Sequence, residues 1–338
     1  MGYSSLGGVT IFRTQTAKGV TAADIDTEGM AVRLLSGAMA GNRELLIPDP
    51  EMGGNRDVSD GLGGPISYGT DYEFNLRFNF IATFLKAALG SAVTAGTAAE
   101  GFTHTFTPTD TSELPYLTIF ERISDGLDYS MYTDCVVNTF HLETDPGSYL
   151  TGTVGIIGRE QVAGVPDIPT TGLYDNTTMT VGTNVLVKYN GTDVAAKSFS
   201  IDINNNFEDD DFRLGSFFLK DLTPKRREVT MSMNLRHENK DKMRQALLGS
   251  PTATTPQGIT TKFGLSVEIT TYENIPGTTP PKRYSLTLTI PQCIFEPAAF
   301  EPSGDDVLET EFSVRAVRPN PATPILTAVL VNGKEEIA

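Results

Sequence analysis

A pattern that occurs twice constrains this chain more than any other feature of its sequence. Residues 72–80 alternate apolar and polar side chains with the period of a β-strand, and residues 81–89 place their large apolar side chains on one face of a helix. Gly90 follows, and a glycine in the left-handed conformation commonly ends a helix. The same succession of strand, helix and glycine returns over residues 229–250. We therefore expect one structural unit to occur twice along the chain.

The two cysteines extend this repeat. Cys135 and Cys293 are 158 residues apart (293 − 135), and the same offset aligns apolar residues along a later strand of each half. The aligned pairs are Leu150 with Leu308, Val154 with Phe312, and Ile156 with Val314. Upstream, residues 117–119 match residues 265–267, and each triplet begins a strand that leads into a hairpin. We expect two buried thiols at equivalent core positions, too far apart for a disulfide bond.

Short alternating strands separated by Gly, Pro, Asn and Asp make up most of the remaining sequence, and long helices between strands are missing. This pattern is typical of antiparallel β-barrels or β-sandwiches rather than of a parallel α/β sheet. We therefore predict a mainly β chain with two tandem β-barrel or β-sandwich domains of the same fold, each with one short flanking helix. The alternation lapses at prolines in the middle of the chain, which predicts a linker. The predicted boundaries are residues 1–165 for the first domain, 166–180 for the linker and 181–338 for the second domain.

The charge of the chain limits its partners. Among 338 residues, 42 are acidic and 26 are basic, which gives a formal net charge of −16. Such a surface repels DNA phosphates, so we do not expect the protein to bind nucleic acids. A protein past which DNA slides without sticking would, however, benefit from the same negative charge. The alternative is that acidity only keeps the protein soluble. We see no targeting signal and no stretch apolar enough to cross a bilayer, so we expect no membrane association.

Residue types that commonly carry out catalysis do not form a recognisable motif here. His104, His141 and His237 are far apart in the sequence, and none has the spacing of metal ligands. His104 lies in an alternating strand, so we expect it to face solvent or an interface, whereas His141 and His237 receive no role. The sequence shows no nucleophile elbow, His-Glu-x-x-His helix or Cys-x-x-Cys pair. It therefore predicts a protein that is not an enzyme, with no metal and no cofactor.

Several short motifs occur in the same order in both halves of the chain. In the first half they are residues 69–74, 89–91, 102–106, 134–138 and 154–158. In the second half they are residues 198–206, 213–216 and 225–235, followed by a short helix that ends in Leu-Gly-Ser. In this order and duplication, over most of its length, the chain resembles the tail tube proteins of long-tailed, siphovirus-like bacteriophages in a duplicated two-domain form.

The resemblance implies a major structural subunit of a viral tail tube, located in the virion and assembled in the cytoplasm of the bacterial host. Family members with one domain form hexameric rings, whose inner strands join into a barrel around a channel. Two fused copies imply a trimeric, pseudo-hexameric ring, with a hexamer as the alternative. The implied partners are further copies of the chain, tape-measure, tail-terminator and distal tail proteins, and double-stranded DNA that passes during genome delivery without specific binding.

Polar residues of the alternating strands are the candidates for the surface of the channel. They are Glu73, Asn75, Arg77, Asn79, Thr151, Thr153, Thr230, Ser232, Asn234, Glu309 and Glu311. The alternative is that these side chains face solvent on the outside of the tube. Lys225, Arg226 and Arg227 form a basic cluster in an acidic chain, so they are candidates for a contact with an acidic patch of a neighbouring subunit, or they are simply solvated.

The second hypothesis is an extracellular or surface-layer β-repeat protein that binds a polysaccharide or another protein. Such a protein would be expected to carry a signal peptide and exposed aromatic side chains that stack on sugars. The chain contains no tryptophan and shows no recognisable signal, so we favour the tail tube.

Overall fold

The computed structural model describes residues 7–49, 51–52, 57, 60–111, 113–124, 129–170, 172–236, 240–297 and 309–338. Within these ranges the chain is mainly β, as the sequence predicts, with nineteen strands and two α-helices. The strands of the first half are β1 (Val9–Thr14), β2 (Met30–Val32), β3 (Leu34–Ser36), β4 (Ala40–Leu46), β5 (Leu62–Asn75), β6 (Gly90–Thr97), β7 (Gly101–Pro108), β8 (Leu117–Arg122), β9 (Tyr129–Thr144), β10 (Thr151–Gly158) and β11 (Glu160–Ala163). Those of the second half are β12 (Val185–Tyr189), β13 (Thr192–Val194), β14 (Ala196–Asn204), β15 (Glu228–Arg236), β16 (Phe263–Asn274), β17 (Arg283–Phe295), β18 (Glu309–Ala316) and β19 (Thr327–Asn332). The helices are α1 (Ile81–Leu89) and α2 (Asp241–Leu248).

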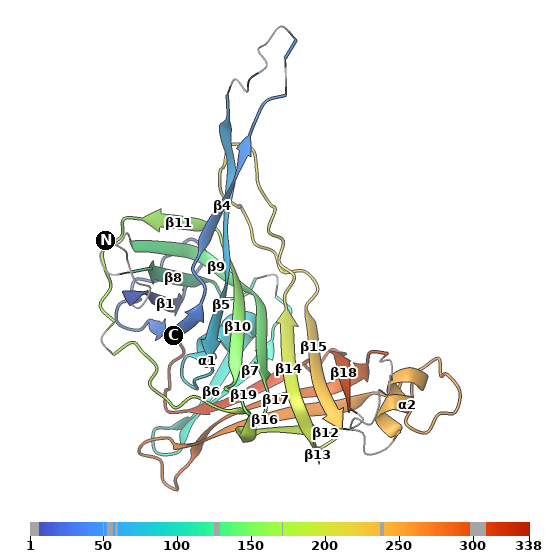
Figure 1. The fold of residues 1–338 in the computed structure, drawn as a ribbon. Helices are drawn as coiled ribbons and strands as arrows, with labels where there is room; N and C mark the ends of the chain where they lie inside the picture. The colour runs from blue at the N-terminus through green and yellow to red at the C-terminus, as the bar shows by residue number, and fades with distance from the viewer. Residues whose placement is uncertain are drawn as a thin grey trace.

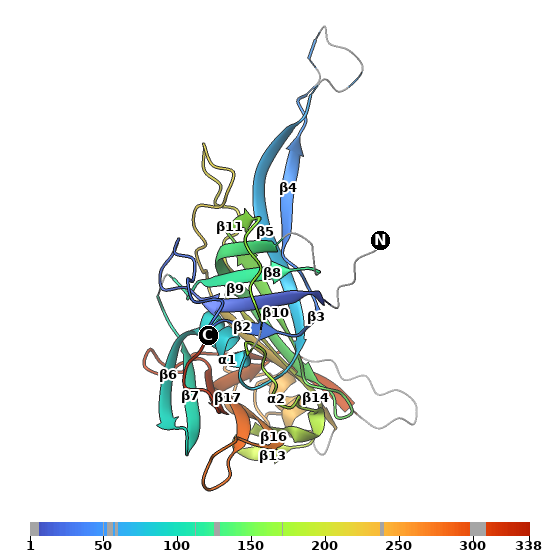
Figure 2. The same ribbon diagram turned by 90° about the vertical axis from the view of Figure 1, so that its left-hand side faces the viewer.

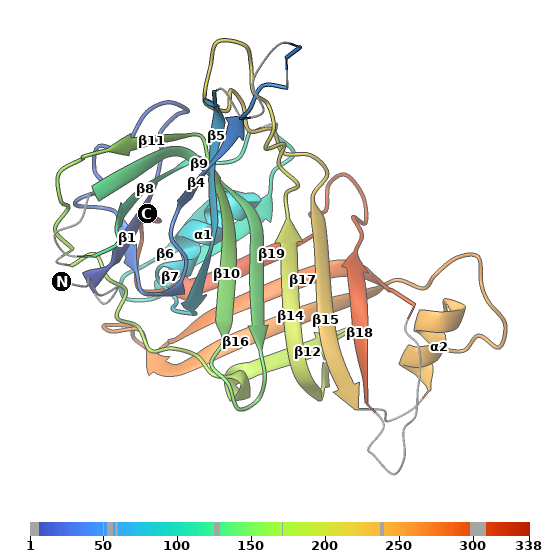
Figure 3. The same ribbon diagram turned by 45° about the horizontal axis from the view of Figure 1, so that its top comes forward.

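Two layers of strands enclose the core. Strands β5, β10, β9, β14, β15 and β18 pair in this order as an antiparallel sheet, the front sheet, whose strands run side by side in Figure 3. Strands β12, β16, β17, β19 and β7 pair behind the front sheet and cross it steeply (Figures 1 and 3). At one side, β1, β8 and the first part of β9 lie next to one another (Figure 2). β17 pairs with β18 of the front sheet as well as with β16 and β19 behind it, and β9 pairs with β8 at the side as well as with β10 and β14 of the front sheet, so one continuous sheet bends around the core.

Local sequence explains both helices. α1 follows the alternating strand β5 and buries eight of its nine residues. It ends at Gly90, which has a φ of 97° and donates its N–H to the carbonyl of Lys86. α2 ends in the same way at Gly249, with a φ of 87°, but it buries only Gln245 and Ala246. The predicted succession of strand, helix and glycine is therefore confirmed in both halves, although β5 ends at Asn75, before the end of the alternating residues 72–80. Neither helix of the described residues has the length and apolar character needed to span a bilayer.

Aromatic rings and the two thiols occupy the core. The ring of Phe12 lies edge-to-face against the rings of Tyr72 and Phe84, with centroids 5.3 and 5.0 Å apart. Cys135 and Cys293 are both free and buried. Burial disfavours the thiolate, so it raises the pKa of Cys135 and raises that of Cys293 to about 12. The prediction of two buried thiols without a disulfide bond is confirmed.

The two halves use the same strand order. The first half pairs in the order β2–β1–β8–β9–β10–β5–β3, and the second half pairs in the order β13–β12–β16–β17–β18–β15–β14. Leu117 lies opposite Cys135, and Phe263 lies opposite Cys293. Leu117 therefore corresponds to Phe263, whereas the sequence pattern matched it with Leu265, two residues later. The pattern could not reveal this error, because a shift of two residues keeps every side chain on the same face of a strand.

The halves are joined by strand pairing as well as by the chain. β14 of the second half pairs with β9, and β19 pairs with β7 of the first half. The predicted linker, residues 166–180, packs onto the first half, where Ile168 is buried. Asp175 accepts hydrogen bonds from the backbone N–H groups of Asn79 and Phe80 at 2.9 and 3.1 Å. The division into two tandem domains stays a prediction, since strand pairs run across it.

A hairpin formed by β4 and the first part of β5 extends away from both layers (Figures 1 and 2). Glu121 fixes its base, because its carboxylate accepts the backbone N–H of Met39 at 3.1 Å and the hydroxyl of Tyr72 at 2.6 Å. Desolvation raises the pKa of Glu121, and these two hydrogen bonds oppose that shift. All residues of β4 are exposed beyond this base. The hairpin is therefore anchored to the core at one end.

Candidate functional site

The front sheet has one buried face and one open, polar face. Phe74, Val154, Phe140, Ile201 and Phe312 are buried on the core side, so their neighbours in each strand lie on the opposite side. Cross-strand registers connect these neighbours into rows, which we call the polar face. The first row is Glu73, Thr153, His141, Asp202, Thr230 and Arg315. The second row is Asn75, Thr151, Glu143, Ser200, Ser232 and Ser313. The third, shorter row is Ser198, Asn234 and Glu311.

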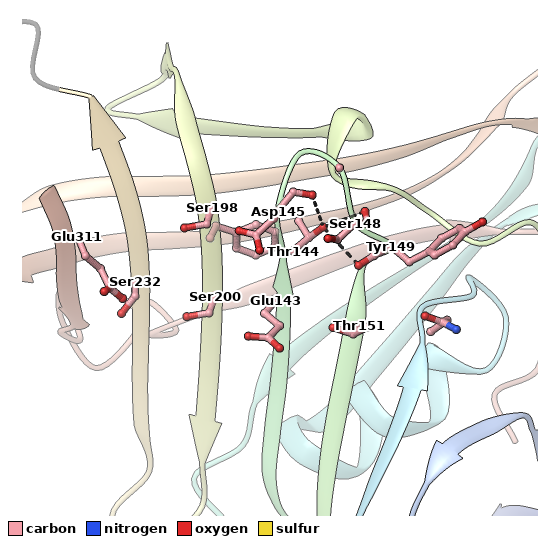
Figure 4. Close-up of a pocket in the computed structure, with 13 residues that line it drawn as sticks. Glu143, Thr144, Asp145, Ser148, Tyr149, Thr151, Ser198, Ser200, Ser232 and Glu311 are labelled. Carbon is pink, nitrogen blue, oxygen red and sulfur yellow. Dashed lines mark hydrogen bonds between the residues drawn. The ribbon is translucent and has the colours of Figure 1, made fainter. Parts of the chain in front are cut away.

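An open groove of about 600 Å³ crosses the polar face. Figure 4 shows Glu143, Thr151, Ser200, Ser232 and Glu311 on its walls, contributed by successive strands. Most side chains of the groove end in hydroxyl or carboxylate groups, which hydrogen-bond water well. The face therefore offers a hydrated surface rather than an apolar platform for a ligand.

Carboxylates give the polar face a negative charge. Its rows contain the acidic residues Glu73, Glu143, Asp202 and Glu311. Arg315 is the permanently charged base of these rows, and its guanidinium is already bound by Glu296 at 3.1 Å and by Glu228 at 3.5 Å. The remaining charge is negative, so the surface repels phosphate groups.

His141 lies where the two halves meet, on β9 beside β14. Its Nδ1 is 2.6 Å from a carboxylate oxygen of Asp202, and its Nε2 is 3.4 Å from one of Glu143. The hydrogen bond with Asp202 raises the pKa of His141, and partial burial opposes this shift. In the protonated ring both nitrogens donate, so each carboxylate receives an N–H. The cluster joins the halves across the polar face.

The structure brings nine of the eleven candidate channel residues to the exposed side of the front sheet. Eight of them lie in the three rows, namely Glu73, Asn75, Thr151, Thr153, Thr230, Ser232, Asn234 and Glu311. Glu309 begins β18 and forms an ion pair with Lys197. Arg77 and Asn79 lie beyond the end of β5. There Arg77 donates to the carbonyl of Thr177, and the Asn79 amide donates to Asp175 at 3.2 Å, so both hold the segment before the second half.

The three residues of the basic cluster have different surroundings. Lys225 is exposed and lies 3.8 Å from a carboxylate oxygen of Glu208, and Arg226 is exposed as well. The Arg227 guanidinium is mostly buried and donates to the side-chain oxygen of Asn205 at 2.8 Å. Desolvation lowers the pKa of Arg227. Its role inside the chain is therefore structural, whereas Lys225 and Arg226 present charge to the surroundings.

The expectation that His104 faces solvent or an interface is wrong. His104 is fully buried, on a strand that pairs with β6 on one edge and with β19 on the other. Its Nε2 lies 3.0 Å from the side-chain oxygen of Asn332, and its Nδ1 lies 2.8 Å from the hydroxyl of Thr94. The ring is a hydrogen-bonded part of the core. His237 lies outside the described residues.

Sequence reasoning missed part of the polar face. Seven of its residues are absent from the predicted set, namely His141, Glu143, Ser198, Ser200, Asp202, Ser313 and Arg315. The alternation of residues 198–204 was a usable signal, because Phe199, Ile201 and Ile203 are apolar and the residues between them are polar. In the part of the chain that the structure describes, no group of three or more His, Cys, Asp or Glu side chains could hold a metal ion. The arrangement is that of a hydrated, acidic surface.

Comparison with known proteins tests this interpretation independently. A search of curated proteins found no match to the chain. The family model described as phage tail tube protein matches residues 8–316, and this range contains every strand of the front sheet. The chain therefore belongs to the phage tail tube protein family.

Proposed function

We propose that this protein is the major subunit of the tail tube of a siphovirus-like bacteriophage and that it assembles into stacked rings around the channel for genome delivery. Membership of the family identifies a structural protein of the virion tail. The polar face is the observation that supports the proposed role as the lining of a channel. It is continuous over six strands, rich in hydroxyls and carboxylates, and backed by the core. DNA would pass such a lining without sticking, because carboxylates repel phosphates and bound water separates the surfaces.

Three chains per ring is the stoichiometry that we propose, ahead of six. The two halves share one strand order, so each half would fill one of six similar positions in a closed ring. The proposed partners are further copies of the chain, tape-measure, tail-terminator and distal tail proteins, with assembly in the host cytoplasm. Lys225 and Arg226 remain candidates for a contact with an acidic patch of a neighbouring subunit.

Electron microscopy of the purified protein tests the assembly. We expect negative-stain images to show hollow rings or tubes with threefold or pseudo-sixfold symmetry. Monomers that persist over a wide range of protein concentration would contradict the proposal. A sixfold ring without threefold character would support the hexamer instead.

Thiol labelling of assembled tubes tests which face lines the channel. Both native thiols are buried, so the variants Thr153→Cys and Tyr272→Cys each offer one accessible thiol. Thr153 belongs to the polar face, whereas Tyr272 is 71% exposed on the other layer. We expect a bulky polymer-linked maleimide to label Tyr272→Cys in tubes and to label Thr153→Cys only after the tubes are dissociated. Labelling of Thr153→Cys in intact tubes would place the polar face on the outside.

A further inference from the structure

Glu121 is a buried carboxylate at the place where the hairpin of β4 and β5 leaves the core. It lies on β8 and is only 4% exposed. β5 pairs with β10 as far as Tyr68, and β4 begins at Ala40, so the hairpin beyond these residues pairs with no third strand among the described residues. The direction of the hairpin (Figures 1 and 2) therefore depends on the contacts at its root.

The Glu121 carboxylate makes the central contact at this root. The backbone N–H of Met39 lies 3.1 Å from both carboxylate oxygens, and the hydroxyl of Tyr72 donates to one of them at 2.6 Å. The carbonyl of Met39 accepts the hydroxyl of Tyr132 at 3.4 Å. Met39 directly precedes β4, and Gly37 lies two residues before it with a φ of 109°. The carboxylate thus holds the backbone group from which the hairpin starts.

No cation neutralises this carboxylate. Among the described residues, Glu121 forms no ion pair with a Lys, Arg or His side chain. Arg33 lines the same groove, but its guanidinium donates to the carbonyl of Asp175 at 2.9 Å. Arg122 lines it as well and is bound to Asp167 at 2.9 Å. A buried charge without an opposite charge is costly, so ionised Glu121 depends on the N–H and O–H groups that donate to it.

The groups packed around Glu121 stay neutral while it titrates. β1 places the uncharged Thr10 opposite Glu121. The titratable neighbours on β5 and β9 are Tyr68, Tyr72, Tyr132 and Cys135. Burial raises the pKa of each of them, that of Tyr132 to about 12, so none is charged between about pH 5 and pH 8. A change of charge at this root therefore comes from Glu121 itself.

Protons can reach Glu121 from the solvent. The residue lines an open groove of about 590 Å³ between residues 32–38 and residues 8–10. Desolvation raises the pKa of Glu121, and the hydrogen bonds from Tyr72 and Met39 oppose this shift. Since the net shift is upward, Glu121 takes up its proton at a higher pH than an exposed glutamate does.

We propose that Glu121 is a proton-sensitive latch that sets the direction of the hairpin. In the ionised carboxylate both oxygens accept hydrogen bonds, so Met39 and Tyr72 are held together. Protonation converts one oxygen into a hydroxyl group, and the two donors then compete for the oxygen that remains. The root is released, and the hairpin turns about the segment of Gly37 while the pairing of β5 with β10 persists. The latch acts within a single chain, so it does not depend on the ring.

Distances between two spin labels test the latch. Leu46 of β4 and Val162 of β11 are 49% and 46% exposed, whereas both native thiols are buried, so Leu46→Cys with Val162→Cys offers two accessible thiols. Pulsed electron paramagnetic resonance of dissociated chains should give one narrow distance distribution at about pH 8 and a broad one at about pH 5. Adding Glu121→Gln should give the broad distribution at both pH values, because glutamine, like a protonated carboxyl group, has one accepting oxygen and one donor.

The matched control carries both labels away from the hairpin. Tyr149 is 52% exposed in the segment between β9 and β10, so Tyr149→Cys with Val162→Cys reports on the body of the chain. Its distribution should stay narrow at both pH values, with and without Glu121→Gln. A control that broadens together with the hairpin pair would show general loosening of the fold and would overturn the latch.

The variant Tyr72→Phe provides a second measurement, which decides the matter if Glu121→Gln does not fold. It keeps the carboxylate and removes one of its donors. Because the hydrogen bond from Tyr72 lowers the pKa of Glu121, its loss should move the midpoint of the broadening to higher pH by about one unit. A midpoint that does not move, or a narrow distribution in Glu121→Gln at both pH values, would overturn the inference.

Discussion

At the scale of single residues, His141 links the two halves where β9 pairs with β14. Asp202 and Glu143 would repel each other across β9 and β14 if the imidazole between them were neutral. The hydrogen bond to Asp202 raises the pKa of His141 above its usual value of 6.5. The contact therefore contributes stability that is fully present below about pH 6.5 and is lost as the pH rises through the raised pKa of the folded state.

The variant Asp202→Asn should lower the pKa of His141 and weaken the protein at acidic pH, with little effect at alkaline pH. The reason is that the neutral amide no longer favours the protonated imidazole. Titration of the His141 ring by NMR, together with thermal unfolding between about pH 5 and pH 8, measures both effects. Ser200→Ala on the same strand is the control and should leave the pKa unchanged. A His141 pKa that is the same in Asp202→Asn and in the unmodified protein would contradict the assignment.

At the scale of elements, the two glycines that end the helices are not equivalent. Both have positive φ, which strains any residue with a Cβ. A Cβ on Gly90 would also collide with the hydroxyl of Thr109 and lie 2.9 Å from Leu114, whereas a Cβ on Gly249 would have its nearest neighbour, Gln257, at 3.4 Å. The difference follows from the position of the helices, since α1 is packed in the core and α2 lies at the surface.

We expect Gly249→Ala to cost about 1 kcal/mol of unfolding free energy, from backbone strain alone. Gly90→Ala should cost at least about 2 kcal/mol, because overpacking adds to the same strain. Urea unfolding of dissociated chains, followed by circular dichroism, measures both values. Equal losses in the two variants would show that Thr109 and Leu114 move aside without cost.

At the scale of the whole molecule, one sheet and one large hydrophobic cluster extend through both halves. The cluster includes Phe74 and Phe140 from the first half and Phe199 and Phe312 from the second. The pairings of β9 with β14 and of β7 with β19 bring these residues together. Unfolding one half would expose the face that it covers on the other.

Calorimetry of dissociated chains should therefore show a single cooperative transition, with agreement between calorimetric and van't Hoff enthalpies. The physical reason is the shared core, since the halves cannot lose their packing independently. Two resolved transitions would instead support two tandem domains that fold separately on either side of residues 166–180.

Local periodicity made much of this structure predictable. The alternation of residues 72–80 predicted the last residues of β5, although the strand ends at Asn75. The apolar face of residues 81–89 predicted α1, and Gly90 predicted its end. The same signals predicted β15 and α2. Because every second residue of a strand lies on the same face, the polar residues of β5, β10, β15 and β18 could also be separated from the apolar ones before any coordinates were known.

The sequence by itself thus determined the β class, the repeated strand and helix, the buried thiols and the polar residues of four of the six strands of the polar face, because each depends on which side of a local element is apolar. The tertiary structure decided the register of Phe263 against Cys293, the burial of His104 beside Asn332 of β19, and the contact of His141 with Asp202. These features depend on which distant strand lies alongside, and a period of two is compatible with many such partners and with every shift of two residues.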